Sequence, residues 1–166
     1  RFTLLLTADS QSAERLEQEL GFFAPELSVL HFPDWETLPY DQFSPHQDII
    51  SQRIASLYRL PELSRGVLVV PITTALHRLA PTRFLLGTSL VLDVGQKLNV
   101  EQMRTRLESA GYRCVDTVYE HGEFAVRGAL IDLFPMGSEL PYRIDLFDDE
   151  IETLRTVVQN GRYGKP

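Results

Sequence analysis

The sequence predicts an α/β fold in two parts: a parallel layer of strands and helices, then a small α+β domain with antiparallel strands. Over the first 88 residues, short apolar runs alternate with amphipathic segments of helical period, an order that implies parallel strands joined by right-handed crossovers. After residue 88, one helical segment precedes three strand candidates separated by short turns, which is typical of antiparallel pairing. The 43% share of hydrophobic residues in 166 is enough for packed cores.

The first part contains three strand candidates and three helix candidates. Its apolar runs predict strands over 2–7, 28–32 and 66–71. Helical spacing predicts helices over 12–20, 47–60 and 73–79, of which the first stops at Gly21 and the last at Pro81. The apolar stripe of the second helix is expected to be Ile50, Ile54, Leu57 and Tyr58.

The second part begins with a strand candidate over 89–94. Asn99 has the chemistry of a helix N-cap, and a helix is expected from there to Ala110, closed by Gly111. Three further strands are predicted over 114–119, 123–133 and 142–147. We place the domain boundary near Gly87, giving domains 1–88 and 89–155 and a tail of unusual sequence, 156–166.

Composition bounds the function. The net charge is −7, and both halves are acidic, −3 before residue 89 and −4 after it. Because DNA binding is normally driven by basic patches that neutralise phosphates, autonomous DNA binding is disfavoured. The one cysteine, Cys114, fits a reducing cytoplasm, and no apolar run reaches the length of a transmembrane helix. The chain opens inside a strand candidate without a Met, so we expect a fragment of a longer cytoplasmic protein.

The motifs of several enzyme classes are missing from the sequence. It has no GxxxxGK[ST] and no GxGxxG, so no backbone cradle for nucleotide phosphates is predicted. Four histidines without ligand-like spacing and one cysteine predict no metal site. The segment EHGE at 120–123 is either an acid–base pair or a polar turn, and the turn is favoured because successive strand residues face opposite sides. We therefore expect no catalytic residue, cofactor or metal in this chain.

The segment EFAVRGALIDLFP, 123–135, reads as one apolar strand interrupted by an arginine. Strand alternation places Arg127 on the face opposite Asp132. In the next strand, Arg143, Asp145 and Phe147 share the face that is not apolar. Arg127 and Arg143 are thus predicted to share one sheet surface with an exposed aromatic, the usual composition of a protein–protein hot spot.

A purely structural interpretation stays open beside this one. In it, Arg127 pairs with Asp145 or Asp132 across the sheet, and Phe147 covers the core. Gly128, beside the arginine, would permit a bulge or a close backbone approach.

A second conspicuous segment is the proline-rich loop DWETLPYDQFSPHQD, 34–48. Its aromatic residues, Trp35, Tyr40 and Phe43, either form a ligand platform or pack the loop onto its own sheet. We favour packing.

Two long blocks, DWETLPYDQFSPHQDIISQRIASLYRL at 34–60 and EHGEFAVRGALIDLFPMGSELPYRIDLFDDEIETLR at 120–155, resemble the amino-terminal region of the bacterial transcription-repair coupling factors. The second block is also similar to the matching module of the repair helicase subunit UvrB. The resemblance implies a degenerate RecA-like layer without a P-loop, similar to UvrB domain 1, followed by a UvrA-binding module similar to UvrB domain 2. After Arg155, the segment TVVQNGRYGKP departs from the family pattern, so we expect this module either to be cut short or to end in unrelated sequence.

The resemblance also implies a function and a site. Such a region recruits UvrA to RNA polymerase stalled at DNA lesions, while ATP and Mg2+ belong to motor domains elsewhere in the parent protein. The UvrA contacts would be Arg127, Arg143 and Phe147, with Gly128 and Asp145 in support. We expect a non-catalytic adaptor; the alternatives are a DNA-binding or nucleotide-binding accessory domain of a helicase or translocase, or an enzyme.

Overall fold

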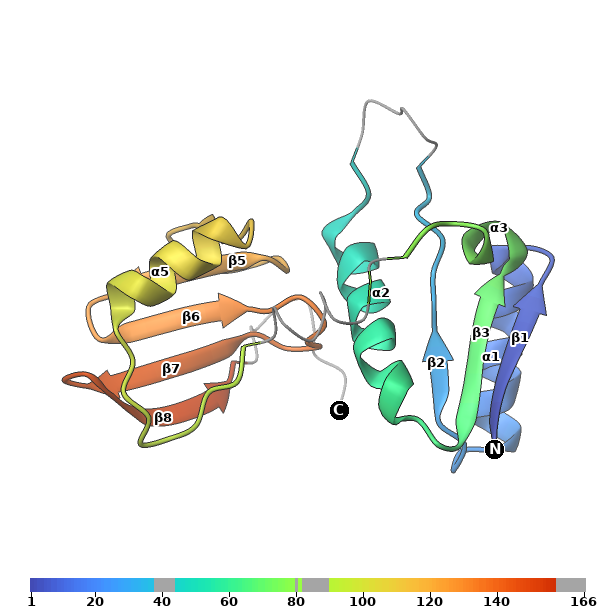
Figure 1. Ribbon diagram of the computed structural model, residues 1–166, viewed down its shortest axis with the longest axis horizontal. Coiled ribbons are helices and arrows are strands. Elements are labelled where there is room, and N and C mark those ends of the chain that lie inside the picture. Colours follow the sequence, from blue (N-terminus) through green and yellow to red (C-terminus); the bar gives the residue numbers. More distant parts are fainter. Residues whose placement is uncertain (38–43, 80, 82–89, 158–166) are drawn as a thin grey trace. The chain divides into compact units, whose positions relative to one another are not determined.

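The computed structural model of the chain describes residues 1–37, 44–79, 81 and 90–157 (Figure 1). The chain divides into two compact units, residues 1–89 and 90–166. Our expected boundary at Gly87 lies outside the described residues. Because the first unit holds a parallel sheet and the second a mostly antiparallel one, the predicted fold class is confirmed.

The first unit is a three-stranded parallel sheet between helices. Its elements are β1 (Phe2–Thr7), α1 (Ser10–Phe23), β2 (Val29–His31), α2 (Gln47–Arg59), the 3-10 helix η1 (Leu60–Glu62), β3 (Gly66–Pro71) and α3 (Ile72–Ala75). The strand order is β1-β3-β2, and every residue of the central β3 is buried. Val67 and Val69 pack with α1, whereas Leu68 and Val70 pack on the side of α2. The two helices therefore cover opposite faces of the sheet.

Helix α1 runs beyond its predicted end. Gly21 lies inside its last turn, and the helix continues to Phe23, where the amide of Ala24 donates to the carbonyl of Leu20 at 2.9 Å. The stop at Gly21 was wrong because a glycine is also tolerated in right-handed helix. The end is set by Pro25, since a proline disfavours helical backbone at the residue before it.

Helix α2 begins at the predicted residue and ends at Arg59, one residue before the predicted end, and its buried face differs from the predicted one. Its buried residues are Ser51, Arg53 and Ser56. Of the predicted stripe, Leu57 packs partly buried against the core, whereas Tyr58 is exposed. Two hydrogen bonds fix the rotation of α2 about its axis. The hydroxyl of Ser56 donates to the carbonyl of His31, and Arg53 donates to the carbonyl of Pro33 at 2.6 Å. These polar side chains satisfy backbone groups at the end of β2, which an apolar stripe would leave unpaired.

The second unit is a five-stranded sheet covered on one face by a helix (Figure 1). Its elements are α5 (Val100–Ser109), β4 (Arg113–Cys114), β5 (Glu123–Arg127), β6 (Leu130–Phe134), β7 (Tyr142–Phe147) and β8 (Glu150–Thr156), with strand order β4-β5-β6-β7-β8. Only the β4–β5 pair is parallel. Asn99 caps α5 as predicted, accepting the amide of Gln102. Met103 and Leu107 of this helix pack onto the core residues Phe124, Ile131, Leu133, Ile144, Leu146 and Ile151.

Three strand predictions in this unit were wrong. The single strand over 123–133 is the hairpin β5–β6, and β8 was not predicted. The strand expected over 114–119 is reduced to Arg113–Cys114. Over the described residues 90–94 no strand forms, although the following segment meets the edge of β8 through a bridge between Lys97 and Glu150.

Candidate partner-binding surface

The hairpin between β5 and β6 determines which side chains share the outer face of the sheet. Arg127 pairs with Leu130, so the turn consists of Gly128 and Ala129. Gly128 has φ of +60°, a backbone conformation that favours glycine. A Cβ there would meet no atom within 4 Å, so the predicted close backbone approach was wrong. The glycine instead forms the tight turn that ends the strand at Arg127.

Chain reversal at this turn places Asp132 with Arg127 and not opposite it. Asp132 pairs with Ala125 of β5 on one side and with Arg143 of β7 on the other, and residues paired across a sheet point to the same face. The predicted face of Asp132 was therefore wrong. The prediction that Arg127 and Arg143 share a face holds. We call the set Arg127, Asp132, Arg143, Asp145 and Phe147 the arginine face.

The arginine face lies on the side of the sheet that α5 does not cover. The apolar residues of the same strands point to α5. On the outer side, Val115 and Val118 pack over Ala125 and Phe134, toward one end of the strands. Toward the other end, Phe147 has 74% of its surface exposed. The alternative in which Phe147 covers the core was therefore wrong, and a large aromatic side chain is available to a partner.

Asp132 is the central acceptor of the arginine face. Arg143 donates to both of its carboxylate oxygens, from Nε at 2.6 Å and from Nη2 at 2.8 Å, and Arg127 donates a third hydrogen bond from Nη2. The hydrogen bonds of Arg143, partly opposed by burial, hold the pKa of Asp132 below its usual value. The same pair raises the pKa of Arg143. A planar guanidinium gripping a carboxylate at two points is held in one orientation.

Pairing with Asp132 leaves Arg127 accessible. The Arg127 side chain remains 50% exposed and that of Arg143 29%, while that of Asp132 is only 10% exposed. The structural interpretation, a pair between Arg127 and Asp132, is thus present, and it is compatible with partner binding. The contact of Arg127, Arg143 and Phe147 with UvrA stays a prediction.

Asp145 forms an ion pair with Arg155, which was not among the predicted site residues. It lies opposite Thr153 of β8, accepts a hydrogen bond from the Thr153 hydroxyl, and pairs with Arg155 at 3.1 Å. Arg155 was missed because β8 was not predicted. The alternation in EIETLRT, 150–156, was the signal that could have revealed it.

The EHGE segment, 120–123, forms a turn that is held by hydrogen bonds to the carboxylate of its last residue, Glu123. The Glu123 carboxylate is 9% exposed; it accepts the amides of Tyr119 and Glu120 and pairs with Arg113 at 3.0 Å. His121 lies against the ring of Phe134 and its Nε2 is 2.9 Å from a carbonyl oxygen. The interpretation as a polar turn is confirmed.

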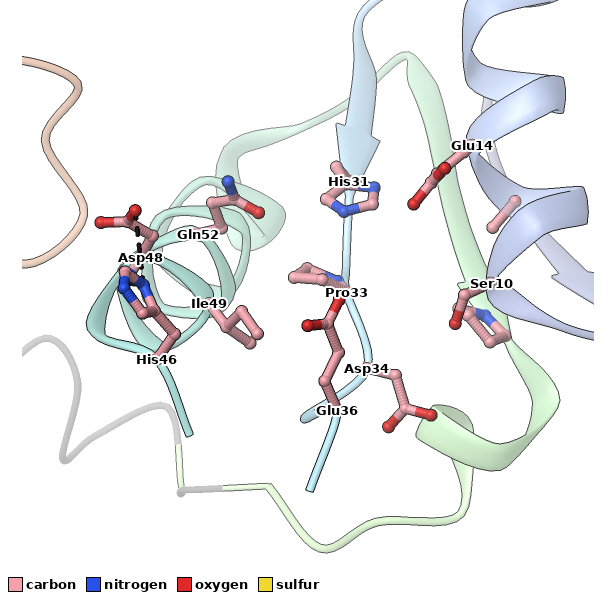
Figure 2. Close-up of a pocket in the computed structure, with 12 residues that line it drawn as sticks. Ser10, Glu14, His31, Pro33, Asp34, Glu36, His46, Asp48, Ile49 and Gln52 are labelled. Atoms are coloured by element: carbon pink, nitrogen blue, oxygen red, sulfur yellow. Dashed lines mark hydrogen bonds and ion pairs between the residues drawn. The ribbon is translucent and has the colours of Figure 1, made fainter. Parts of the chain in front are cut away.

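A cavity of about 410 Å³ lies in the first unit, where the strands end (Figure 2). This is the edge at which α/β sheets usually bind ligands. Its titratable lining consists of Glu14, Asp34, Glu36, Asp48, His31 and His46. Within the described part of the chain, neither lysine nor arginine lines it. The four carboxylates outnumber the two histidines, of which His46 pairs with Asp48 at 3.4 Å, and such a predominantly acidic lining disfavours phosphate groups.

Trp35 packs its loop onto the first unit. The guanidinium of Arg53 lies between two rings, 4.1 Å from that of Phe32 and 4.0 Å from that of Trp35. Burial lowers the pKa of Arg53, partly opposed by the charge of Asp34. The favoured packing of this loop is confirmed for Trp35; Tyr40 and Phe43 lie outside the described residues.

Neither a metal cluster nor a membrane-spanning helix is found among the residues described. Over those ranges, no three His, Cys, Asp or Glu side chains are grouped to hold a metal ion. The helices in the same ranges are too short or too polar to cross a bilayer.

Comparison with known proteins decides the family. The model of the UvrB interaction domain matches residues 90–163, a range that extends into the tail we set apart at 156–166. The chain is 58% identical over 152 residues to the transcription-repair-coupling factor of Escherichia coli K12. The chain therefore belongs to the transcription-repair-coupling factor family.

Other members of the family match over the same extent. The factor of Haemophilus influenzae is 51% identical over 154 residues, and that of Mycobacterium bovis is 34% identical over 160 residues. Each alignment covers 92–93% of this chain. The chain spans about 13% of the length of these relatives. Its second unit thus carries a UvrB-type interaction domain.

Proposed function

We propose that this chain is a non-catalytic adaptor that binds UvrA through the arginine face. In a longer transcription-repair coupling factor it would bring UvrA to RNA polymerase stalled at a DNA lesion. The observation that carries the proposal is the pair of exposed groups, Arg127 and Phe147, beside an anchored Arg143 on the open face of a UvrB-type interaction domain.

The geometry of the face suits protein recognition. Arginine and aromatic side chains dominate binding hot spots because they combine large contact area with several donors. Asp132 holds both guanidinium groups in place before binding, so less conformational entropy is lost when a partner docks. Gly128 supports the site by ending the strand in a tight turn, and Asp145 supports it from β7.

The first unit is proposed to be a support without nucleotide chemistry, a degenerate RecA-like layer. Its cavity lies where a nucleotide would bind in such a layer, but its carboxylates oppose phosphate binding. The net charge of −7 likewise opposes DNA binding. ATP, Mg2+ and DNA would be handled by other domains of the full-length protein.

The test is the affinity of the 166-residue chain for purified UvrA, measured by calorimetry. Arg127→Ala and Arg143→Ala should each weaken binding by about 2–5 kcal/mol, because each removes a charged donor from the interface. Arg104→Ala is the matched control. It removes an exposed arginine that pairs with Glu108 on α5, on the covered face of the sheet. Unchanged affinity of the Arg127 and Arg143 variants, with folding intact by circular dichroism, would refute the site.

A further inference from the structure

We infer that Arg155 of β8 is a further UvrA-binding residue and that the interface continues from the arginine face onto this last strand. The inference rests on the proposed function, since it extends the same surface. It predicts that the partner presents carboxylates to arginines of β5, β7 and β8, across the surface that β5 to β8 form.

Register places Arg155 directly beside the arginine face. It lies opposite Arg143 in the β7–β8 pair, and Arg143 lies opposite Asp132 in the β6–β7 pair. Arg127 reaches the same carboxylate from the hairpin end of β5. Guanidinium groups from β5, β7 and β8 therefore gather on one uncovered sheet surface.

The fold gains little from Arg155 at this position. Like charges directly opposite each other in a sheet are unfavourable, and Arg155 faces Arg143. Its compensating pair with Asp145 involves an arginine side chain that is 61% exposed, and water weakens an ion pair whose arginine is exposed in this way. Stability alone thus does not account for an arginine at this point.

The charges are layered in a way that suits an acidic partner. The two carboxylates lie deep, with the side chains of Asp132 and Asp145 10% and 17% exposed. The side chains of Arg127 and Arg155 stand above them, 50% and 61% exposed. Above these two carboxylates the outermost charged groups are therefore cationic, although the chain has a net charge of −7. Arg155 contacts Asp145 from its Nη2 at 3.1 Å, and a guanidinium carries five N–H donors, more than one carboxylate can use.

The experiment compares the affinity for UvrA of the 166-residue chain and its Arg155→Gln variant. We expect a loss of about tenfold and a weaker dependence on salt, because one ionic contact is removed. Arg104→Gln is the matched control; it also removes one exposed, ion-paired arginine, but on the other side of the sheet, and should stay within about twofold.

A second variant separates contact from side effects. Arg155→Gln leaves Asp145 without its arginine, and the freed carboxylate would itself repel an acidic partner. The double variant Arg155→Gln with Asp145→Asn removes both charges and should still bind about tenfold more weakly than the unchanged chain. Recovery of full affinity in the double variant would overturn the inference.

The outcomes distinguish this inference from the proposed function. If the unchanged chain does not bind UvrA, or Arg127→Ala binds as well as the unchanged chain, the proposed function fails, and the inference fails with it. If Arg127→Ala weakens binding while Arg155→Gln behaves like Arg104→Gln, the inference alone is overturned. Weakening by both Arg127→Ala and Arg155→Gln supports the continuous surface.

Discussion

Replacing Asp132 by Asn should destabilise the second unit strongly. Asparagine keeps the volume but removes the charge that holds two arginines. The part-buried two-point pair with Arg143, at 2.6 and 2.8 Å, belongs to a class that contributes about 1.5–3 kcal/mol. The half-exposed Arg127 adds about 0.2–1 kcal/mol. Allowing for the hydrogen bonds that an amide retains, the expected loss of unfolding free energy is about 2–3 kcal/mol.

Amide hydrogen exchange of the second unit measures this loss. A change of 2–3 kcal/mol corresponds to exchange about 30- to 150-fold faster in peptides from β6 and β7. Trp35, the one tryptophan of the chain, lies in the first unit. The urea-induced unfolding of that unit, followed by Trp35 fluorescence, should therefore keep the same midpoint. Asp149→Asn is the control: this carboxylate, 56% exposed, pairs with the exposed Lys97, so its loss should leave exchange in the second unit nearly unchanged.

The pH dependence has a definite sign. Because the pKa of Asp132 is lowered in the folded chain, its ionised form stabilises the fold above its unfolded pKa of about 3.9. This contribution disappears as the pH falls through the lower, folded value. The difference between the unchanged chain and Asp132→Asn should therefore be full at neutral pH and shrink below about pH 4. If Asp132→Asn is as stable at neutral pH as the control Asp149→Asn, the central role of Asp132 is refuted.

Three further predictions concern other parts of the chain. Arg53→Met should lower the stability of the first unit by about 2–4 kcal/mol in urea titrations followed by Trp35 fluorescence, because it removes two cation–π contacts and a donor to the carbonyl of Pro33. Arg59→Met, at an exposed position of the same helix, should cost less than about 1 kcal/mol, and equal losses would contradict the account. Gly128→Val should destabilise the second unit by about 1–2 kcal/mol in hydrogen exchange because φ is positive there, whereas Gly128→Asn should cost clearly less; equal effects would contradict the turn. Isothermal titration with ATP should give no saturable heat, and tight binding would refute the proposed role of the first unit.

The spacing of apolar residues and the residue types in the turns were enough to predict a parallel sheet followed by a mostly antiparallel one. The fully buried run 66–71 became the central strand β3, and Asn99 began its helix at the predicted place. These features are local, since a strand or helix cap is specified by neighbouring residues. The shared face of Arg127 and Arg143 was also predicted.

The errors arose where pairing between distant residues decides the structure. The run 123–133 is largely apolar on both sides of Gly128, so the apolar pattern does not reveal the turn of Gly128 and Ala129. Because of this turn, Asp132 lies on the opposite face of the sheet from the one predicted. The buried face of α2 was missed for a related reason, because Arg53 is buried by rings and a carbonyl that come from the other end of a loop. Arg155 was missed because its strand, β8, was not predicted.

The most direct measurement of the central claim is amide hydrogen exchange of the 166-residue chain with and without UvrA. The account predicts slower exchange at the β5–β6 turn, 127–130, and along β7 to the turn 147–150, with the cavity residues of the first unit unchanged. Protection confined to the first unit, or none in the second at UvrA concentrations that saturate binding, would contradict it.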